Sequence, residues 1–138
     1  MTTGGTLLLA GGGHSHSLLL KRWAMRPERR PQQSITLINR RSTALYSGMV
    51  PGLIAGIYQR DELAIDLRQL CDRAGVAFVE AEITGLDAEQ NCLHLRDRPA
   101  LHFDWLSLDV GAVSRPNSRG IPIKPLEAAL AFLESEDP

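Results

Sequence analysis

Residues 6–16, TLLLAGGGHSH, carry the strongest structural signal in the sequence. Its first five residues form a short apolar run that stops at three glycines, and this pattern predicts a buried strand of a parallel sheet. Residues 14–25 predict a helix, with Ser15 or His14 near its N-cap. A second β-branched and apolar strand is predicted over residues 34–38. Strand, glycine turn, helix and strand within roughly 33 residues have the dimensions of one βαβ unit.

The glycine turn has two of the three glycines of the dinucleotide fingerprint GxGxxG. Gly11 permits the tight turn, and Gly13 lacks a Cβ, so that a pyrophosphate can approach the N-terminus of the helix. The third position, normally Gly or Ala, is His16. A glycine turn that serves the fold alone and binds no ligand is the alternative. His14 and His16 do not predict a metal site, because no third ligand is near and the helix dipole repels a cation.

The residue after the second strand also departs from the fingerprint. An Asp or Glu normally stands there and accepts hydrogen bonds from ribose hydroxyls, whereas this chain has Asn39 followed by Arg40. The Asn39 amide accepts such a bond less strongly, and Arg40 is suited to pair with a phosphate or to stack on adenine. Recognition of the ribose, and a preference for an NADP-type phosphate, therefore stay open.

Beyond Arg40 the sequence predicts an irregular segment and then further helices and strands. Residues 40–60 are glycine-rich and long for a connection, which is typical of a functional loop. Residues 61–74 have helical spacing, and Gly75 is a plausible stop for that helix. The remaining predictions are a strand over 76–80, an antiparallel meander over about 82–103, a return strand over 105–110 and a helix over 125–135.

The composition excludes several classes of protein. A chain of 138 residues with 43% hydrophobic and 22% charged residues has room for one folded domain with a core. No apolar run reaches the ~20 residues that span a bilayer, and the N-terminus lacks the pattern of a signal peptide. Cys71 and Cys92 form neither a CxxC motif nor a disulfide framework, so we expect the reducing cytoplasm.

The charges are unevenly distributed along the chain. Residues 1–60 contain eight Lys and Arg against one acid, and the remainder contains seven against fifteen acids. A basic half favours an anionic partner such as a nucleotide. Solvated loops and helix ends explain these charges equally well. Binding of nucleic acid is not expected, because no aromatic stacking platform accompanies the arginines.

Six segments then stand in a characteristic order: LLLAGGGHSHSLLLKRWAM, ITLINR, YSGMVPGLIAG, IDLRQL, AEITGLD and FDWLSLDVG. Together they resemble the N-terminal half of the pyridine nucleotide-disulfide oxidoreductase superfamily, in the branch of type II NADH dehydrogenases and sulfide:quinone reductases. GGGHSH and YSGMVPGLIAG are most similar to the flavoprotein domain fused to, or encoded near, selenide, water dikinases. The resemblance implies an α/β protein with a Rossmann-like, three-layer FAD/NAD(P)-binding fold, which has a parallel sheet and a small antiparallel β-meander and is incomplete here.

The resemblance also implies FAD as the cofactor and NAD(P)H as the co-substrate of the full-length protein. The glycine turn would then face the FAD pyrophosphate through Gly11, Gly12, Gly13, His14, Ser15 and His16. The remaining contacts would be Asn39 and Arg40 at the adenosine ribose, the backbone of Ile83 at the adenine, Ser47, Gly48 and Pro51 toward the flavin, and Gly111 where the chain crosses near the cofactor.

Hydride transfer from NAD(P)H to the flavin and on to an unidentified acceptor is the activity that the resemblance implies. The CxxxxC motif of the disulfide reductases is absent from the first helix, which disfavours their mechanism. Asp109 is either functional or an ordinary polar strand terminus. Since family members run to several hundred residues, we expect residues 1–138 to be an N-terminal fragment without its C-terminal half.

Such a fragment should retain FAD weakly or not at all, be inactive alone and tend to self-associate through an exposed sheet edge or apolar face. No transmembrane segment is expected, while peripheral contact with a membrane stays open. A noncatalytic dinucleotide-binding or partner-docking module is the alternative function.

Overall fold

The computed structural model describes residues 4–115, 120 and 122–135. These residues group into two compact units. Unit 1 comprises the described residues of Met1–Tyr46 and Ala64–Val110, and unit 2 those of Ser47–Leu63 and Gly111–Pro138. The expectation of a single N-terminal domain piece over residues 1–138 stays a prediction.

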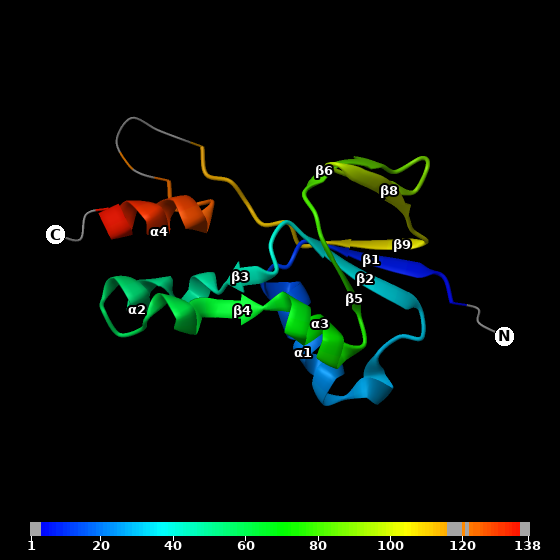
Figure 1. Cartoon of the computed structure of the whole chain (residues 1–138), viewed down its shortest axis with the longest axis horizontal. Coiled ribbons are helices and arrows are strands. Elements are labelled where there is room, and N and C mark those ends of the chain that lie inside the picture. Colours follow the sequence, from blue (N-terminus) through cyan, green and yellow to red (C-terminus); the bar gives the residue numbers. More distant parts are fainter. Residues whose placement is uncertain (1–3, 116–119, 121, 136–138) are drawn as a thin grey trace. The chain divides into compact units, whose positions relative to one another are not determined.

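A four-stranded parallel sheet forms the centre of unit 1 (Figure 1). Its strands run in the order β5-β2-β1-β9, so that β1 lies between β2 and β9. All four predicted strands are present: β1 has the predicted ends, and the ends of the other three differ from the prediction by at most two residues. The strands are β1 (Thr6–Ala10), β2 (Ser34–Asn39), β5 (Ala77–Glu80) and β9 (Trp105–Leu108).

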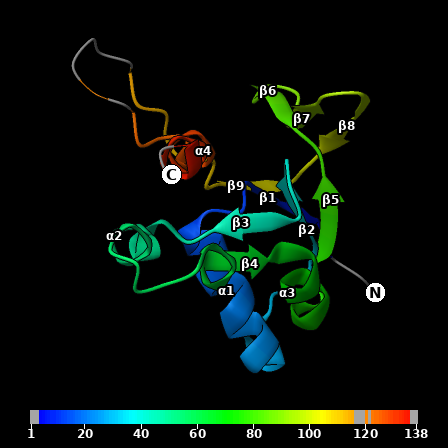
Figure 2. The same cartoon turned by 60° about the vertical axis from the view of Figure 1, so that its left-hand side comes forward.

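Helices cover one face of this sheet and a three-stranded antiparallel sheet covers the other (Figures 1 and 2). In β1, Leu9 packs on the helical side with Leu20 and Trp23, whereas Leu8 packs on the opposite side with Leu93. Since successive side chains of a strand point to opposite faces, burial on both sides explains the unbroken apolar run. The three layers confirm the predicted fold class. The covering elements are α1 (His14–Met25), α3 (Leu67–Ala74), β6 (Ile83–Asp87), β7 (Cys92–Leu95) and β8 (Arg98–His102).

The helix predicted over residues 61–74 is shorter than expected. The structure has a 3-10 turn, η3 (Arg60–Leu63), then the strand β4 (Ala64–Asp66), and only then α3. β4 pairs in antiparallel fashion with β3 (Thr43–Leu45), and this long-range pairing outweighs the local helical spacing. Asp66 caps α3 by accepting a hydrogen bond from the Gln69 N–H at 2.9 Å, and Gly75 ends the helix with a left-handed φ of 66°.

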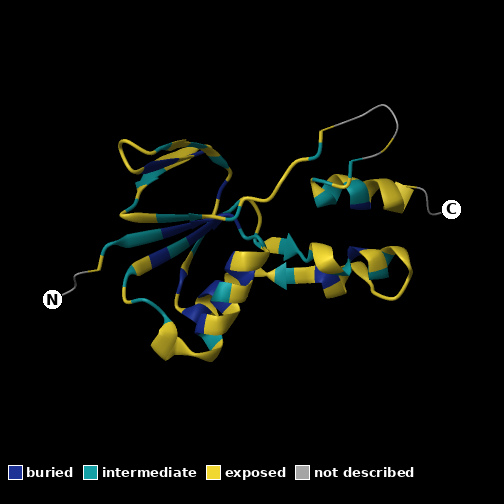
Figure 3. Ribbon diagram, turned by 180° about the vertical axis from the view of Figure 1, so that it is seen from behind, coloured by how far each residue is buried: buried dark blue, intermediate teal, exposed yellow. Residues whose placement is uncertain are grey.

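The segment expected to be irregular, residues 40–60, contains short elements. Besides the strand β3, they are the 3-10 turn η2 (Ser47–Met49) and the helix α2 (Val50–Ile54), both in unit 2. The C-terminal helix of unit 2, α4 (Leu126–Ser135), agrees with the prediction over 125–135. A further 3-10 turn, η1 (Pro27–Arg29), follows α1 in unit 1. Figure 3 shows that buried residues concentrate in the sheet and helices of unit 1, while unit 2 is mostly exposed.

Across the described residues, the model contains no helix that combines the length and the apolar character needed to cross a membrane.

Candidate functional site

The strand order places a topological switch point at β1. The chain leaves β1 through α1 to reach β2 on one side, and it returns as β9 on the other side. In open α/β sheets, ligands bind outside the carboxyl ends of the strands at such a point. The residues that stand there are the glycine turn, Gly11 to Gly13, which follows β1, and Asp109, which follows β9.

Gly11 is required by the packing of the turn. Its φ of 92° lies in the region that L-residues with a side chain rarely adopt. A Cβ at this position would lie 2.3 Å from the backbone oxygen of Asp109, and the Gly11 N–H donates to the Ile38 carbonyl at 2.8 Å. The first glycine therefore lets the turn pass against the end of β9.

At Gly13 the space that a side chain would fill holds a carboxylate. A Cβ here would lie 2.3 to 2.5 Å from the carboxylate atoms of Asp109. One oxygen of that carboxylate, Oδ2, accepts a hydrogen bond from the His16 N–H at 3.0 Å. Gly13 itself is the N-cap of α1, so His14 and Ser15 lie next to the N-cap as expected, and no side chain of the helix caps it. Asp109 supplies the capping oxygen from the neighbouring strand.

His16 occupies the third position of the fingerprint as part of the fold. The side chain is only 3% exposed, and both ring nitrogens are engaged. Nδ1 lies 2.7 Å from the Gly11 carbonyl oxygen, and Nε2 lies 2.8 Å from the Ser107 Oγ. Because a carbonyl only accepts, Nδ1 carries a proton and donates it to the Gly11 oxygen, while Nε2 pairs with the Ser107 hydroxyl, which can donate or accept. One imidazole thus links the turn, α1 and β9.

His14 faces a different partner from His16. It is exposed and stacks on Tyr46, with ring centroids 5.0 Å apart and an interplanar angle of 18°. The two imidazoles of the HSH motif therefore do not converge on a common point. Among the described residues, no group of three His, Cys, Asp or Glu side chains is arranged to hold a metal ion.

Three backbone N–H groups at the start of α1 are available to a ligand. Within the described part of the chain, the N–H groups of Gly13, His14 and Ser15 have no hydrogen-bond acceptor. This follows from helix geometry, since the first N–H groups lack an intrahelical partner and carry the positive end of the helix dipole. Such a set of donors fits an anionic group, a phosphate above all.

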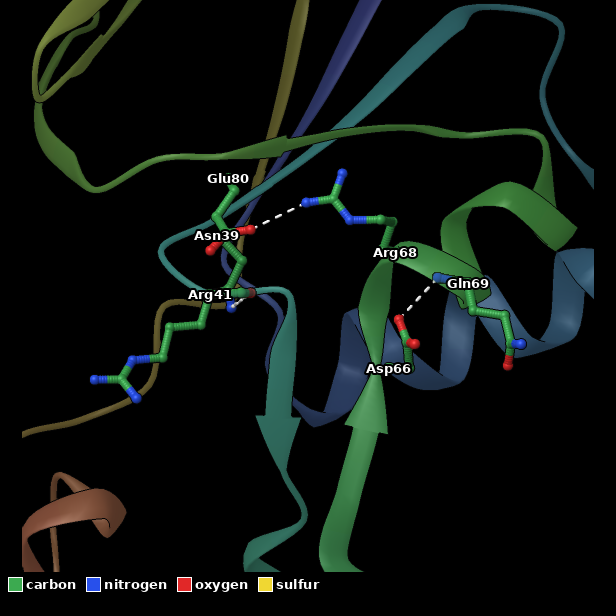
Figure 4. Close-up of polar contacts among 6 residues, drawn as sticks. All are labelled: Asn39, Arg41, Asp66, Arg68, Gln69 and Glu80. Carbon is green, nitrogen blue, oxygen red and sulfur yellow. Dashed lines mark hydrogen bonds and ion pairs between the residues drawn. The ribbon is translucent and has the colours of Figure 1, made fainter. Parts of the chain in front are cut away.

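The Asn39 side chain holds the glycine turn from the end of β2. Its Oδ1 accepts from the Gly12 N–H at 3.0 Å, and its Nδ2 donates to the Arg41 carbonyl at 2.8 Å (Figure 4). A Cβ at Gly12 would lie 2.4 Å from a methyl group of Leu67 and 3.2 Å from the Asn39 amide carbon. The amide is thus engaged with the turn, and Arg40 lies exposed next to it in the chain.

A carboxylate does stand beside Asn39, on the adjacent strand. Glu80 ends β5 and pairs with Asn39 in the parallel register. The Glu80 Oε2 lies 3.0 Å from the Arg68 Nη2 (Figure 4). The Arg68 guanidinium also lies 5.0 Å from the centre of the Phe78 ring. Glu80 was not predicted as a site residue, because the dinucleotide fingerprint has its acid directly after the second strand, whereas Glu80 ends the neighbouring strand β5.

The other residues expected at a cofactor are placed as follows. Ile83 begins β6 and pairs with Leu95 in unit 1. Ser47, Gly48 and Pro51 are exposed residues of η2 and α2 in unit 2. Gly111 is exposed and has a φ of 79°. The structure brings together the six residues of the turn and Asn39, all in unit 1.

The cysteines offer no reactive group. Both are buried, and burial raises the pKa of the Cys71 thiol to about 12. At neutral pH this thiol stays protonated and is therefore no nucleophile.

No protein-family model matches the chain. Solved structures do share its architecture. NDH2 from Plasmodium falciparum in complex with NADH has a TM-score of 0.65 and 18% identity, over 93% of this chain and 28% of that one. The water-forming NADH oxidase from Lactobacillus brevis bound to NADH has a TM-score of 0.66 and 16% identity, over 96% of this chain and 32% of that one. The sulfide:quinone oxidoreductase from Aquifex aeolicus has a TM-score of 0.64 and 20% identity, over 77% of this chain and 24% of that one.

The chain has a Rossmann-like FAD/NAD(P)-binding fold. At identities of 16 to 20%, these three similarities show the fold alone. The chain spans about a quarter to a third of the length of these structures. Since one fold serves many functions, the function of this chain depends on the residues at its own site.

Proposed function

We propose that the chain is the FAD-binding portion of an NAD(P)H-dependent flavoprotein oxidoreductase of the pyridine nucleotide-disulfide oxidoreductase superfamily. The observation that carries this proposal is the set of three N–H groups without acceptors, those of Gly13, His14 and Ser15, at the switch point of the sheet. Support comes from the fold and from the two similar structures that are bound to NADH.

In this proposal the pyrophosphate binds to the N–H groups at the start of α1. Asn39 and His16 fix the turn through their own hydrogen bonds, so that these donors are in place before a ligand arrives. Arg40 and Glu80 face the adenosine ribose, with the Glu80 carboxylate suited to its hydroxyls. Ile83 borders the adenine. The flavin end is assigned to Ser47, Gly48, Pro51 and Gly111.

Bound FAD supplies the redox chemistry, accepting a hydride from NAD(P)H and passing electrons to an acceptor. The described residues contribute binding and orientation. The NAD(P)H-binding part belongs, in this proposal, to the C-terminal half of the same protein, and the fragment alone is inactive.

The proposal extends to partners and compartment. The similarity of GGGHSH and YSGMVPGLIAG favours a selenide, water dikinase as a fused or neighbouring protein. Two free, buried cysteines favour the reducing cytoplasm. β9 is an edge strand on which Trp105 and Leu108 are more than half exposed, which favours self-association of the fragment. Sedimentation at increasing concentration tests this last point.

One observation favours the partner-docking form of the alternative, a module that binds no dinucleotide. The Asp109 carboxylate already lies at the N-terminus of α1, where the pyrophosphate is proposed to bind. Measured binding of FAD separates this form from the proposed function.

A pair of variants at His14 tests the proposed site. His14 is the first residue of α1, a position where proline is well tolerated, and Gly13 before it has the extended conformation that a following proline requires. His14→Pro therefore removes one N–H and leaves the helix intact. His14→Ala keeps the N–H and removes only the ring that stacks on Tyr46.

Titration with FAD, followed by quenching of flavin fluorescence, gives the affinities. We expect His14→Pro to weaken binding about tenfold or more, as for the loss of a hydrogen bond to a charged group, and His14→Ala to change it by less than about threefold. Equal affinities of the two variants would contradict the phosphate contact. A wild-type chain that takes up no FAD would refute the proposed function.

A further inference from the structure

We propose that the Asp109 carboxylate acts as an internal anion at the N-terminus of α1, competes there with the phosphates of a dinucleotide, and so sets the affinity of the site. This inference rests on the proposed function and adds to it a residue that determines affinity. The glycine fingerprint gives no hint of such a group, because Asp109 lies 93 positions from His16 in the chain.

The geometry places the carboxylate inside the turn. Its oxygens lie 2.3 and 2.5 Å from the point that a Cβ of Gly13 would occupy, and Oδ2 accepts from the His16 N–H at 3.0 Å. The backbone of Asp109 is fixed as well, since its N–H donates to the Ala10 carbonyl at 2.8 Å. The carboxylate is therefore held at this position by β9 and does not reach it by chance.

The position of the Asp109 carboxylate matters because it lies beside the N–H groups that are proposed to bind the pyrophosphate. The His16 N–H bound by Asp109 directly follows the N–H groups of His14 and Ser15 along the first turn of α1. A carboxylate and a pyrophosphate carry the same sign of charge, and at such short range they disfavour each other. A bound phosphate must displace the carboxylate from the turn or lie against its charge. The expected result is weak binding in the wild-type chain.

Asp109→Asn is the variant that isolates the charge. The Asn amide oxygen has the same shape and still accepts from the His16 N–H, so the cap is preserved. Asp72→Asn is the matched control, since Asp72 is exposed on α3 and the substitution removes the same charge elsewhere in unit 1. Far-UV circular dichroism and thermal melting show whether both variants keep the fold.

The probes are FAD and inorganic pyrophosphate, each titrated into the full 138-residue chain by calorimetry. We expect Asp109→Asn to bind both probes about tenfold or more tightly than the wild type, and Asp72→Asn to differ by less than about twofold. The gain for Asp109→Asn should shrink as salt is raised. In the wild type, the amide resonance of His16 should shift on addition of pyrophosphate, because the anion either displaces the Asp109 acceptor or brings a second negative charge beside it.

The outcomes separate this inference from the proposed function. If the wild type binds FAD and Asp109→Asn binds it equally or more weakly, the inference is wrong and the proposed function stands. The same holds if the His16 amide does not respond to pyrophosphate while FAD binds. If no variant binds FAD, the proposed function fails, and the inference fails with it.

Discussion

The glycine turn of unit 1 and the turn that follows α2 in unit 2 each contain a glycine with positive φ, yet the two glycines have different surroundings. Gly11, with a φ of 92°, is buried, and a Cβ there would lie 2.3 Å from the backbone oxygen of Asp109, the residue after β9. Gly56, with a φ of 72°, is exposed, and nothing lies within 4 Å of its Cβ position. The first glycine is required by packing as well as by conformation, and the second by conformation alone.

Side chains near the two turns show the same contrast. The polar groups of the unit 1 turn bind one another through Asn39, His16 and Asp109. In unit 2, the large side chains of Ile54 and Ile57 are 63% and 70% exposed. Richness in glycine is therefore common to a tightly fixed turn and to an open one, and only the neighbours distinguish them.

The largest effect is expected for Gly11→Ala. The added methyl group overlaps backbone atoms that cannot move without separating β1 from β9, and the positive φ adds strain. We expect a loss of more than about 4 kcal/mol, a large part of the stability of a typical domain. Denaturant titration monitored by circular dichroism measures this loss. A change of less than about 1 kcal/mol would show that the turn is not packed as described.

An intermediate effect is expected for His16→Ala. Removing the ring leaves the buried Gly11 carbonyl and the Ser107 hydroxyl without a partner, at a cost of about 2 to 4 kcal/mol. His14→Ala is the control, since it removes an exposed ring stacked on Tyr46 and should cost less than about 1 kcal/mol. The two midpoints of denaturation are compared directly. Equal losses would indicate that the buried network contributes nothing beyond the exposed stack.

The smallest effect is expected for Gly56→Ala. The same methyl group that disrupts the turn at Gly11 meets open space here, so only the cost of a left-handed φ remains, about 1 kcal/mol. The difference between Gly11→Ala and Gly56→Ala in the same denaturation experiment measures the packing part of the contrast. If Gly56→Ala is the more damaging of the two, the contrast drawn between the turns is wrong.

Local patterns sufficed to predict most of unit 1. The apolar run before Gly11 and the alternating segments of the meander mark strands through their own side chains, and both faces of the sheet are buried as such a run indicates. The start of α3 was missed because β4 exists only through its pairing with β3. A local signal was present all the same, since Asp66 followed three residues later by Gln69 has the pattern of a capping box.

The polar partners of the site could not be predicted from spacing. Asp109 reaches His16 across the sheet, and Glu80 stands next to Asn39 only because β5 pairs with β2 in this register. The sequence showed that His16 replaces the third glycine of the fingerprint. Its hydrogen bonds to Gly11 and Ser107, which the sequence did not predict, give this histidine a structural role. Each of these contacts depends on the order of strands, which no local pattern encodes.

Binding of dinucleotide phosphates at the N-terminus of α1 can be tested by amide-resolved nuclear magnetic resonance of the wild-type chain during titration with FAD. We expect the largest shifts at the N–H groups of Gly13, His14 and Ser15, with smaller shifts at the ends of β2 and β5. Shifts confined to other parts of the chain, or none at millimolar FAD, would contradict it.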